Sequence, residues 1–213
     1  MRTSTADRVY GHVKSGVLAG DYPGGELLTE GGIADAVGCS RTPVREALLR
    51  LQSEGMVRLY PKKGALVVAV SAQEAADVWQ ARALVENWAA PRAFGHGAEI
   101  ADRLGELAAQ MLGYAESGDV TGFTEADRTF HELIVAAAGN EVLARLYHSL
   151  RERQLCINAA AMRVSADRMQ AAFADHERLV ELIRGDDEAA FRELTADHLE
   201  RARVNISAGE GHR

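Results

Sequence analysis

One carboxylate and three imidazoles are the side chains of this sequence best suited to chemistry. Asp127 and His131 are four positions apart: Asp127 directly precedes the mostly apolar stretch RTFHELIVAAAGN, and His131 lies within it. Because residues i and i+4 share one face of a helix, these two side chains would lie together. His176 and His198 lie in two later segments, DHERLVELIRGD and ADHLERARVNI. If the four side chains converge, this ligand set suits a divalent zinc, nickel, manganese or iron ion.

Each of the four residues also has an ordinary interpretation. A lone histidine in an apolar helix is more often a core or surface residue than a ligand. The set is distinguished by the shared face of Asp127 and His131 and by the separate helices of the other two. A six-coordinate cation held by four such ligands would keep two positions open for a small molecule. Asn205, two helical turns after His198, could face the same cavity.

Helices must position these residues, since the chain after residue 70 has only helical periodicity. Six helices are predicted, separated by short runs rich in Gly, Asn, Asp and Ser, near 73–94, 98–116, 120–138, 141–162, 166–184 and 187–207. Asp127 and His131 fall on the third of these helices, His176 on the fifth and His198 on the sixth. The sequence therefore predicts an all-α bundle over residues 71–213, with a metal site between its helices.

The first 70 residues are organised differently. Helical patterns cover residues 5–19, the residues after Thr29, and the segment from SRTPV to Gly55. Two β-prone runs that flank PKKG follow, which predicts a hairpin with lysines at its tip. Three helices and a hairpin, with the short turn GCS before the third helix, are the order of a winged helix-turn-helix. The predicted fold is therefore mainly α, with a winged helix-turn-helix over residues 1–70 and the helical bundle after it.

Cationic and hydroxyl side chains gather on the two elements that a winged helix presents to DNA. A helix N-terminus favours phosphate, and a guanidinium group can bind guanine in the major groove. Taken singly, each residue could be a solvated surface group, but together they favour DNA contact at Ser40, Arg41, Thr42, Arg45, Lys62 and Lys63.

The charge distribution is compatible with this division. The chain of 213 residues has a net charge of −7, yet residues 1–70 hold nine Lys and Arg against seven Asp and Glu. A positive balance at one end is typical of a nucleic-acid-binding end. No apolar run approaches the roughly 20 residues of a membrane helix, and the N-terminus lacks a signal-peptide core. Two isolated cysteines suit a reducing compartment, so we expect a cytoplasmic protein without a membrane partner.

The stretch SRTPVREALLRLQSEGMVRLYPKKGALV resembles the DNA-binding signature of the GntR family of bacterial transcription regulators. This resemblance implies DNA-binding roles for Arg41, Thr42 and Arg45, and it adds Gly64 at the tip of the wing. The preceding segment LLTEGGIADAVGCSR matches the family less well. Relatives commonly carry a long polar residue where this chain has Gly31, so no phosphate contact is expected at that position.

The remainder of the chain is similar to the all-helical FCD domain of the FadR-like branch of that family. The residues that carry the resemblance are DRTFH, DHERLVELIRGD and DHLERA, which fill all four ligand positions. The six predicted helices are similar to the VanR-type version of the domain. By resemblance, the metal would help to bind a small carboxylate effector. The stretch QARALVENWAA would place Arg82 against that carboxylate, with Glu86 as its neighbour; a surface pair of these two residues is the alternative.

These features favour a transcription regulator, not an enzyme. We expect a homodimer that binds a palindromic double-stranded DNA operator and responds to a small organic acid held at a metal site. Zinc is the first candidate for the metal, with nickel and manganese as alternatives. Two other functions stay open at this point: a metal-dependent hydrolase, and an architectural DNA-binding protein without an effector. The hydrolase is disfavoured because no general base is evident and because hydrolysis has no use for a winged helix.

Overall fold

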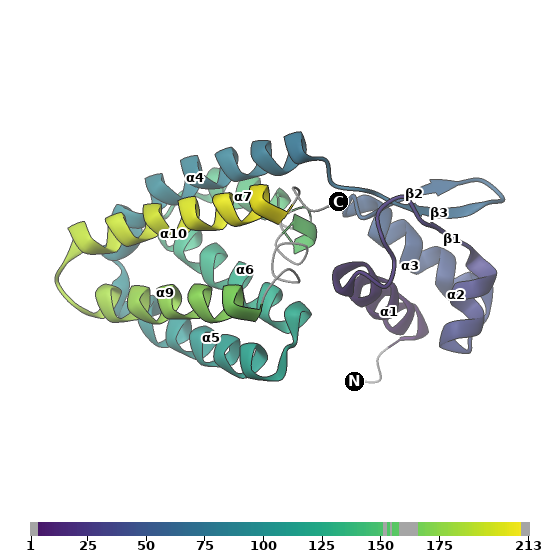
Figure 1. Cartoon of the computed structure of the whole chain (residues 1–213), viewed down its shortest axis with the longest axis horizontal. Coiled ribbons are helices and arrows are strands. Elements are labelled where there is room, and N and C mark those ends of the chain that lie inside the picture. The colour runs from purple at the N-terminus through teal and green to yellow at the C-terminus, as the bar shows by residue number, and fades with distance from the viewer. Residues whose placement is uncertain (1–3, 151–152, 154, 158–165, 210–213) are drawn as a thin grey trace. The chain divides into compact units, whose positions relative to one another are not determined.

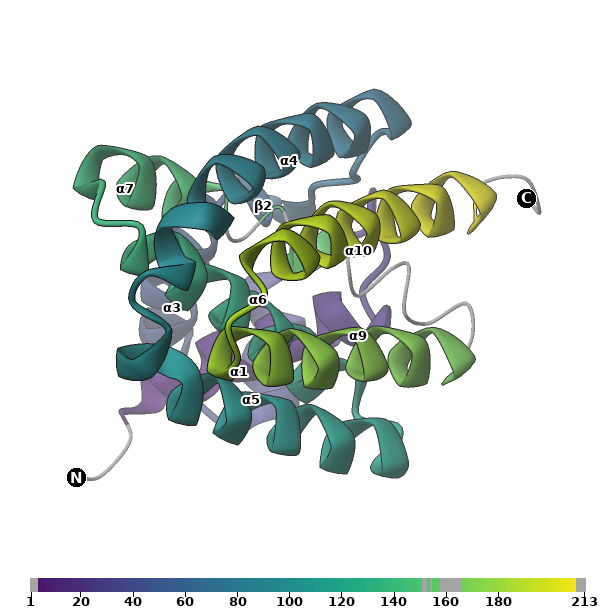
Figure 2. The ribbon, with the colours of Figure 1, turned by 90° about the vertical axis from the view of Figure 1, so that its left-hand side faces the viewer.

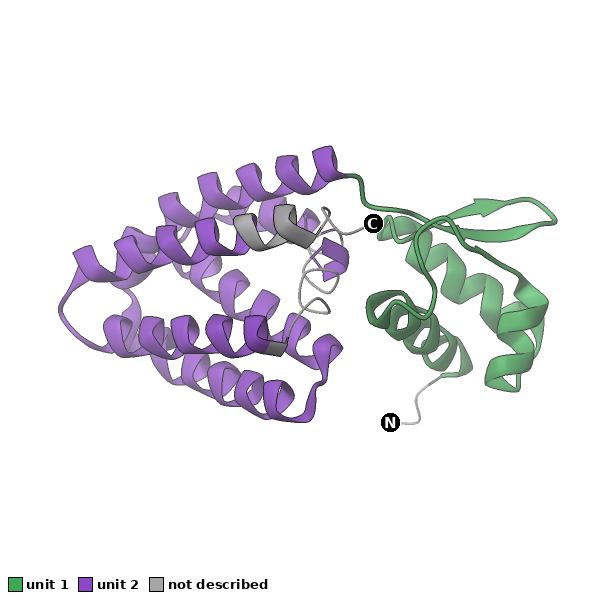
Figure 3. Ribbon diagram, in the orientation of Figure 1, with its two compact units in different colours: residues 1–71 green, residues 72–213 purple. Residues whose placement is uncertain are grey.

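The computed structural model describes residues 4–150, 153, 155–157 and 166–209; for residues 204–209 it describes the backbone alone (Figure 1). The chain forms two compact units, unit 1 with residues 1–71 and unit 2 with residues 72–213 (Figure 3). The observed mainly α architecture, with an N-terminal helix-turn-helix and a C-terminal helical bundle, confirms the predicted fold class.

Unit 1 contains three helices: α1 (Thr5–Ala19), α2 (Glu30–Val37) and α3 (Arg41–Ser53). Apolar side chains at helical spacing place Val9 and Val13 of α1, and Leu48 of α3, in a common core. Each is at most 1% exposed. Gly38, which has a φ of 69°, ends α2 in the left-handed conformation and starts the turn into α3. These contacts fix α3 against α1 and leave its first turn at the surface.

The wing is a three-stranded sheet, which is one strand more than the predicted hairpin. Strands β2 (Val57–Tyr60) and β3 (Gly64–Val67) form the hairpin, and β1 (Leu27–Leu28) pairs antiparallel with the other edge of β3. A strand of two residues is too short to produce a periodic pattern, so β1 could not be recognised in the sequence. Gly64 has a φ of 125° and is buried. A Cβ atom at this position would overlap the carbonyl oxygen of Leu28.

Unit 2 is built from helices alone in its described part: α4 (Ala72–Phe94), α5 (Gly97–Ser117), α6 (Val120–Ala137), α7 (Glu141–Ser149), α9 (Ala166–Arg184) and α10 (Glu188–Gly209). Five of these match the predicted helices closely. The prediction of one helix over 141–162 is wrong in its length, because α7 ends at Ser149 with Leu150 as its C-cap. Much of the remaining range lies outside the described residues.

Helix α6 contacts α4, α5 and α7, while α9 contacts α5 and α10, and α10 contacts α4 (Figure 2). The core between them contains fully buried Leu104, Met111, Phe123, Phe130 and Phe191. Because α6, α9 and α10 all line this interior, polar residues on their inner faces can meet. Asp127 and His198 lie on two of these helices although 71 positions separate them in the sequence. Among the described residues, no helix is long and apolar enough to cross a membrane.

Candidate metal centre and nucleic-acid interface

Four buried polar side chains meet inside unit 2. Asp127 and His131 come from α6, His176 from α9 and His198 from α10. Each offers one ligand atom, and these atoms all lie within 4.8 Å of one another. None of the four residues is more than 5% exposed. The structure thus brings together the residues that sequence reasoning selected as metal ligands.

The separations between these atoms fit a common coordination sphere. His131 Nε2 lies 3.2 Å from His176 Nε2, and Asp127 Oδ1 lies 3.3 Å from His176 Nε2 and 3.7 Å from His131 Nε2. Two ligands about 2.1 Å from one cation are separated by roughly 3.0 Å at octahedral angles and roughly 3.4 Å at tetrahedral angles. These three atoms are spaced as ligands of one cation would be, and because the four ligand atoms spread over as much as 4.8 Å, a divalent cation would draw the side chains slightly together.

A second set of groups orients the three imidazole rings. His131 Nδ1 contacts Glu86 Oε2 at 2.7 Å, and His176 Nδ1 lies 2.6 Å from the carbonyl oxygen of Ala172. His198 Nδ1 lies 3.0 Å from Asp175 Oδ2. The hydrogen bonds of His176 and His198 and the ion pair of His131 favour a proton on Nδ1 and leave Nε2 to bind a cation, which is the arrangement that metal-binding histidines commonly have.

The charges around the site also favour a cation. Burial would raise the pKa of Asp127, but its close contacts with the rings of His131 and His176 outweigh it and hold that pKa well below its ordinary value. Burial would lower the pKa of His131, yet the charge of Glu86 and the contact with Asp127 raise it to about 9. Burial lowers the pKa of His198 to about 4, so this ring is neutral. A metal ion can replace the proton of His131 between the carboxylates.

Arg82 lies next to this centre and is buried, at 2% exposure. Its Nε donates to Glu86 Oε1 at 2.9 Å, and its guanidinium lies 4.3 Å above the Trp79 ring. Arg82 and Glu86 do form an ion pair, but the alternative of a surface pair is wrong because both side chains are buried inside the bundle. Glu86 therefore connects Arg82 to His131, one of the four candidate ligands.

Sequence reasoning missed two residues of this region. Asp175 orients His198. It directly precedes His176 in the sequence, and this acid beside a candidate ligand could have indicated it. Tyr147 donates its hydroxyl to Glu86 Oε1 at 2.6 Å from α7, and no local pattern points to it. Asn205 lies on α10, but its side chain is outside the described residues.

The predicted DNA-binding residues lie on two elements of unit 1. Ser40 is the N-cap residue of α3, and its side chain makes no capping hydrogen bond. Arg41 and Thr42 begin that helix, and both are exposed. Arg45 is 65% exposed, and its Nε lies 2.9 Å from Glu30 in an exposed ion pair. The first turn of α3 thus presents hydroxyl and guanidinium groups to solvent.

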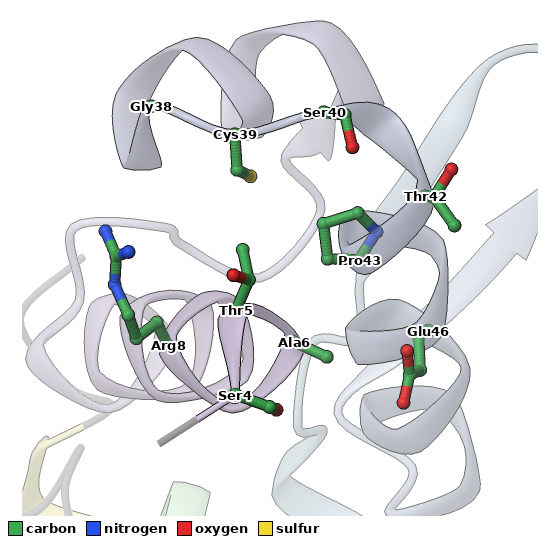
Figure 4. Close-up of a pocket in the computed structure, with 10 residues that line it drawn as sticks. All are labelled: Ser4, Thr5, Ala6, Arg8, Gly38, Cys39, Ser40, Thr42, Pro43 and Glu46. Atoms are coloured by element: carbon green, nitrogen blue, oxygen red, sulfur yellow. The ribbon is translucent and has the colours of Figure 1, made fainter. Parts of the chain in front are cut away.

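The start of α3 also borders a crevice of about 610 Å³ (Figure 4). Ser4, Thr5 and Arg8 of the α1 region line one side, and Ser40 and Thr42 line the other. The first residues of α1 and α3 lie beside it, together with the carboxylate of Glu46, and the N-terminus of α1 is capped by Ser4 and Asp7. A Cβ atom at Gly31 would lie 3.7 Å from a terminal nitrogen of Arg41, so Gly31 lies beside the first residue of α3.

Lys62 and Lys63 form the exposed tip of the wing between β2 and β3. Lys62 has a φ of 64°, which is uncommon for a residue with a Cβ atom. Gly64, also predicted to bind DNA, is buried in β3. Its observed role is steric, since it allows β1 to pair with β3.

Comparisons with known proteins agree with both units. The model of the bacterial regulatory proteins of the gntR family matches residues 5–67, and the FCD domain model matches residues 77–201. The gluconate operon transcriptional repressor of Bacillus subtilis is 27% identical over 193 residues, which are 88% of this chain and 79% of that protein. An HTH-type transcriptional regulator from the TAR-I ttuE-ttuC' intergenic region of Agrobacterium vitis is 34% identical over 142 residues, 63% of this chain and 83% of that protein.

A solved structure of a GntR transcriptional regulator from Rhodococcus sp. RHA1 shares the fold, with a TM-score of 0.77 and 21% identity over 98% of this chain and 99% of that chain. The match to the FCD domain alone covers more than half of the 213 residues. The hydrolase alternative is therefore set aside, because family members of known role among the relatives are transcriptional repressors. This chain belongs to the GntR family of bacterial transcriptional regulators and carries an FCD domain after its helix-turn-helix.

Proposed function

We propose that this regulator binds its DNA operator under the control of a small carboxylate metabolite, which is held in the FCD domain by a divalent cation and Arg82. Asp127, His131, His176 and His198 would bind the cation. The start of α3 and the wing would bind DNA through Ser40, Arg41, Thr42, Arg45, Lys62 and Lys63. The domains would be residues 1–70 and 71–213.

The charge balance of the buried centre carries this proposal. Arg82 and a divalent cation supply three positive charges, while Glu86 and Asp127 supply two negative ones. Asp175 is balanced separately, by Arg201 at 2.9 Å. A buried site with one excess positive charge favours one bound anion. A carboxylate can bridge a cation and a guanidinium group, since it accepts two hydrogen bonds in one plane.

Zinc is our first choice for the cation, because three imidazoles and one carboxylate are ligands that it commonly binds. Nickel and manganese remain candidates, because six-coordinate ions would keep two positions for the carboxylate. The gluconate repressor among the relatives makes sugar acids a sensible first group of effectors. By the same likeness, the protein would repress a metabolic operon in the cytoplasm.

The operator would be a two-fold symmetric DNA site bound by a homodimer, with one α3 in each half-site. The outward side of α4 supports a second copy as partner. Between Asp77 and Arg92 its exposed and half-buried positions carry no charge, and Leu84 is 75% exposed. Charged residues are depleted in the core of protein interfaces. The exposed Val142 and Leu146 of the neighbouring helix α7 extend this surface.

The test is a DNA-binding titration with the apo protein, the Zn²⁺-loaded protein, and the loaded protein with each of a set of small organic acids. A regulator of this kind changes operator affinity by about 5- to 150-fold on effector binding. Equal affinity under all conditions would instead favour the architectural DNA-binding protein. Failure to bind any operator sequence would contradict the proposal entirely.

A further inference from the structure

Helix α7 is held in unit 2 by one fully buried side chain. Among its described residues only Tyr147 is buried, at 1% exposure. Val142 and Leu146 on its outer side are 66% and 52% exposed. A helix of nine residues gains little stability from its own hydrogen bonds, so its position depends on tertiary contacts. The surroundings of Tyr147 therefore decide how firmly α7 is anchored.

The hydroxyl of Tyr147 contacts the carboxylate of Glu86, which also contacts the candidate metal ligand His131. It donates to Glu86 Oε1 at 2.6 Å, and Arg82 Nε donates to the same oxygen at 2.9 Å. The other oxygen, Glu86 Oε2, lies 2.7 Å from His131 Nδ1. No residue of this group is more than 2% exposed. The two contacts to Oε1 are hydrogen bonds to a charged group, whereas His131 and Oε2 form a close ion pair in which Oε2 has no hydrogen bond from any described residue.

We propose that Glu86 and Tyr147 are positioning residues that link occupancy of the cation site to the anchoring of α7. A cation bound at Nε2 fixes the ring of His131 and therefore the position of its Nδ1 atom. The ion pair between Nδ1 and Oε2 then holds the Glu86 carboxylate, whose other oxygen accepts a hydrogen bond from the Tyr147 hydroxyl. Loading of the site thus restricts α7 through three consecutive contacts, without any contact between α7 and the cation.

Arg82 provides a second way in which the site can act on Tyr147, because it also contacts Glu86. Since Arg82 and Tyr147 share Glu86 Oε1, an anion that draws the guanidinium toward itself changes the acceptor available to Tyr147. This inference rests on the proposed cation site, and it adds a route by which the site influences α7 and its exposed apolar side chains. Under the proposed function, these side chains belong to the surface between the two copies.

The variant Tyr147→Phe tests the connection, because it removes the hydroxyl and keeps the ring. Amide hydrogen exchange of residues 142–150 is measured in the full-length protein with and without Zn²⁺. In the unmodified protein we expect Zn²⁺ to slow this exchange about tenfold, the effect of one hydrogen bond to a charged group. In Tyr147→Phe the zinc effect on α7 should fall below about twofold, and zinc affinity should fall by about fivefold, because the coupling between the two is reciprocal. Glu86→Gln should lower zinc affinity by roughly 10- to 100-fold.

Tyr114→Phe is the matched control, since Tyr114 is half-buried on α5 and packs against Gly122, outside this group. It should behave like the unmodified protein in both measurements. An equal zinc effect on α7 in Tyr147→Phe and in the unmodified protein would overturn the inference, although the cation site itself would stand. Zinc binding without any change in α7 exchange would do the same. Absence of zinc binding would overturn both the inference and the proposed function.

Discussion

Removal of the cation should destabilise unit 2 by a measurable amount. Nε2 of His131 and Nε2 of His176 lie 3.2 Å apart beside Asp127, and all three side chains are buried. With free cation at 100 times its dissociation constant, binding to the folded state alone contributes about 2.7 kcal/mol of stability. For a unit of about 142 residues, each kcal/mol shifts the melting midpoint by roughly 3–4 °C, so loading should raise the midpoint by roughly 10 °C.

The assay is thermal melting followed by intrinsic tryptophan fluorescence. Both tryptophans of the chain, Trp79 and Trp88, lie in unit 2, so the signal reports this unit alone. Melting in a chelator is compared with melting in Zn²⁺, and elemental analysis gives the metal content. His198→Ala should remove the shift, because it deletes one ligand and leaves Asp175 without its imidazole partner. The same midpoint with and without metal, together with zinc bound elsewhere, would refute the reasoning about these four residues.

Four further outcomes are expected. Arg45→Ala should abolish specific operator binding and keep the zinc-dependent melting shift, as judged by gel shift and fluorescence melting. Lys62→Gly should remove the backbone strain of a positive φ, about 1 kcal/mol, and so raise the stability of unit 1. The same variant should lower the slope of log DNA affinity against log salt concentration by about one, the contribution of one phosphate contact. Zinc affinity measured by calorimetry should rise with pH between 7 and 9, because the cation must displace the proton of His131, whose pKa is about 9; a flat profile would contradict this. Leu84→Lys should weaken dimerisation in analytical ultracentrifugation without loss of helical content, whereas an unchanged dimer would place the interface elsewhere.

Much of the fold was predictable because local patterns specify it. Five helices of unit 2 and all three helices of unit 1 follow from apolar periodicity and from glycine or proline at their ends. The hairpin followed from β-prone runs around PKKG. Strand β1 did not, because two residues carry no period and its pairing with β3 is a contact across about 38 positions. The length of α7 was also wrong, since the apolar pattern continues past Ser149 where the helix ends.

The sequence by itself determined which residues could bind a cation or DNA: the i, i+4 pair of Asp127 and His131, the later histidines, and the cations at the start of α3 and in the wing. Only the tertiary structure decided that four ligand atoms meet within 4.8 Å. It also decided that Glu86 is shared by Arg82, His131 and Tyr147, residues up to 65 positions apart. The physical reason is that side-chain type and helical phase are local properties of a sequence. The convergence of side chains from α4, α6, α7, α9 and α10 depends on how these helices pack.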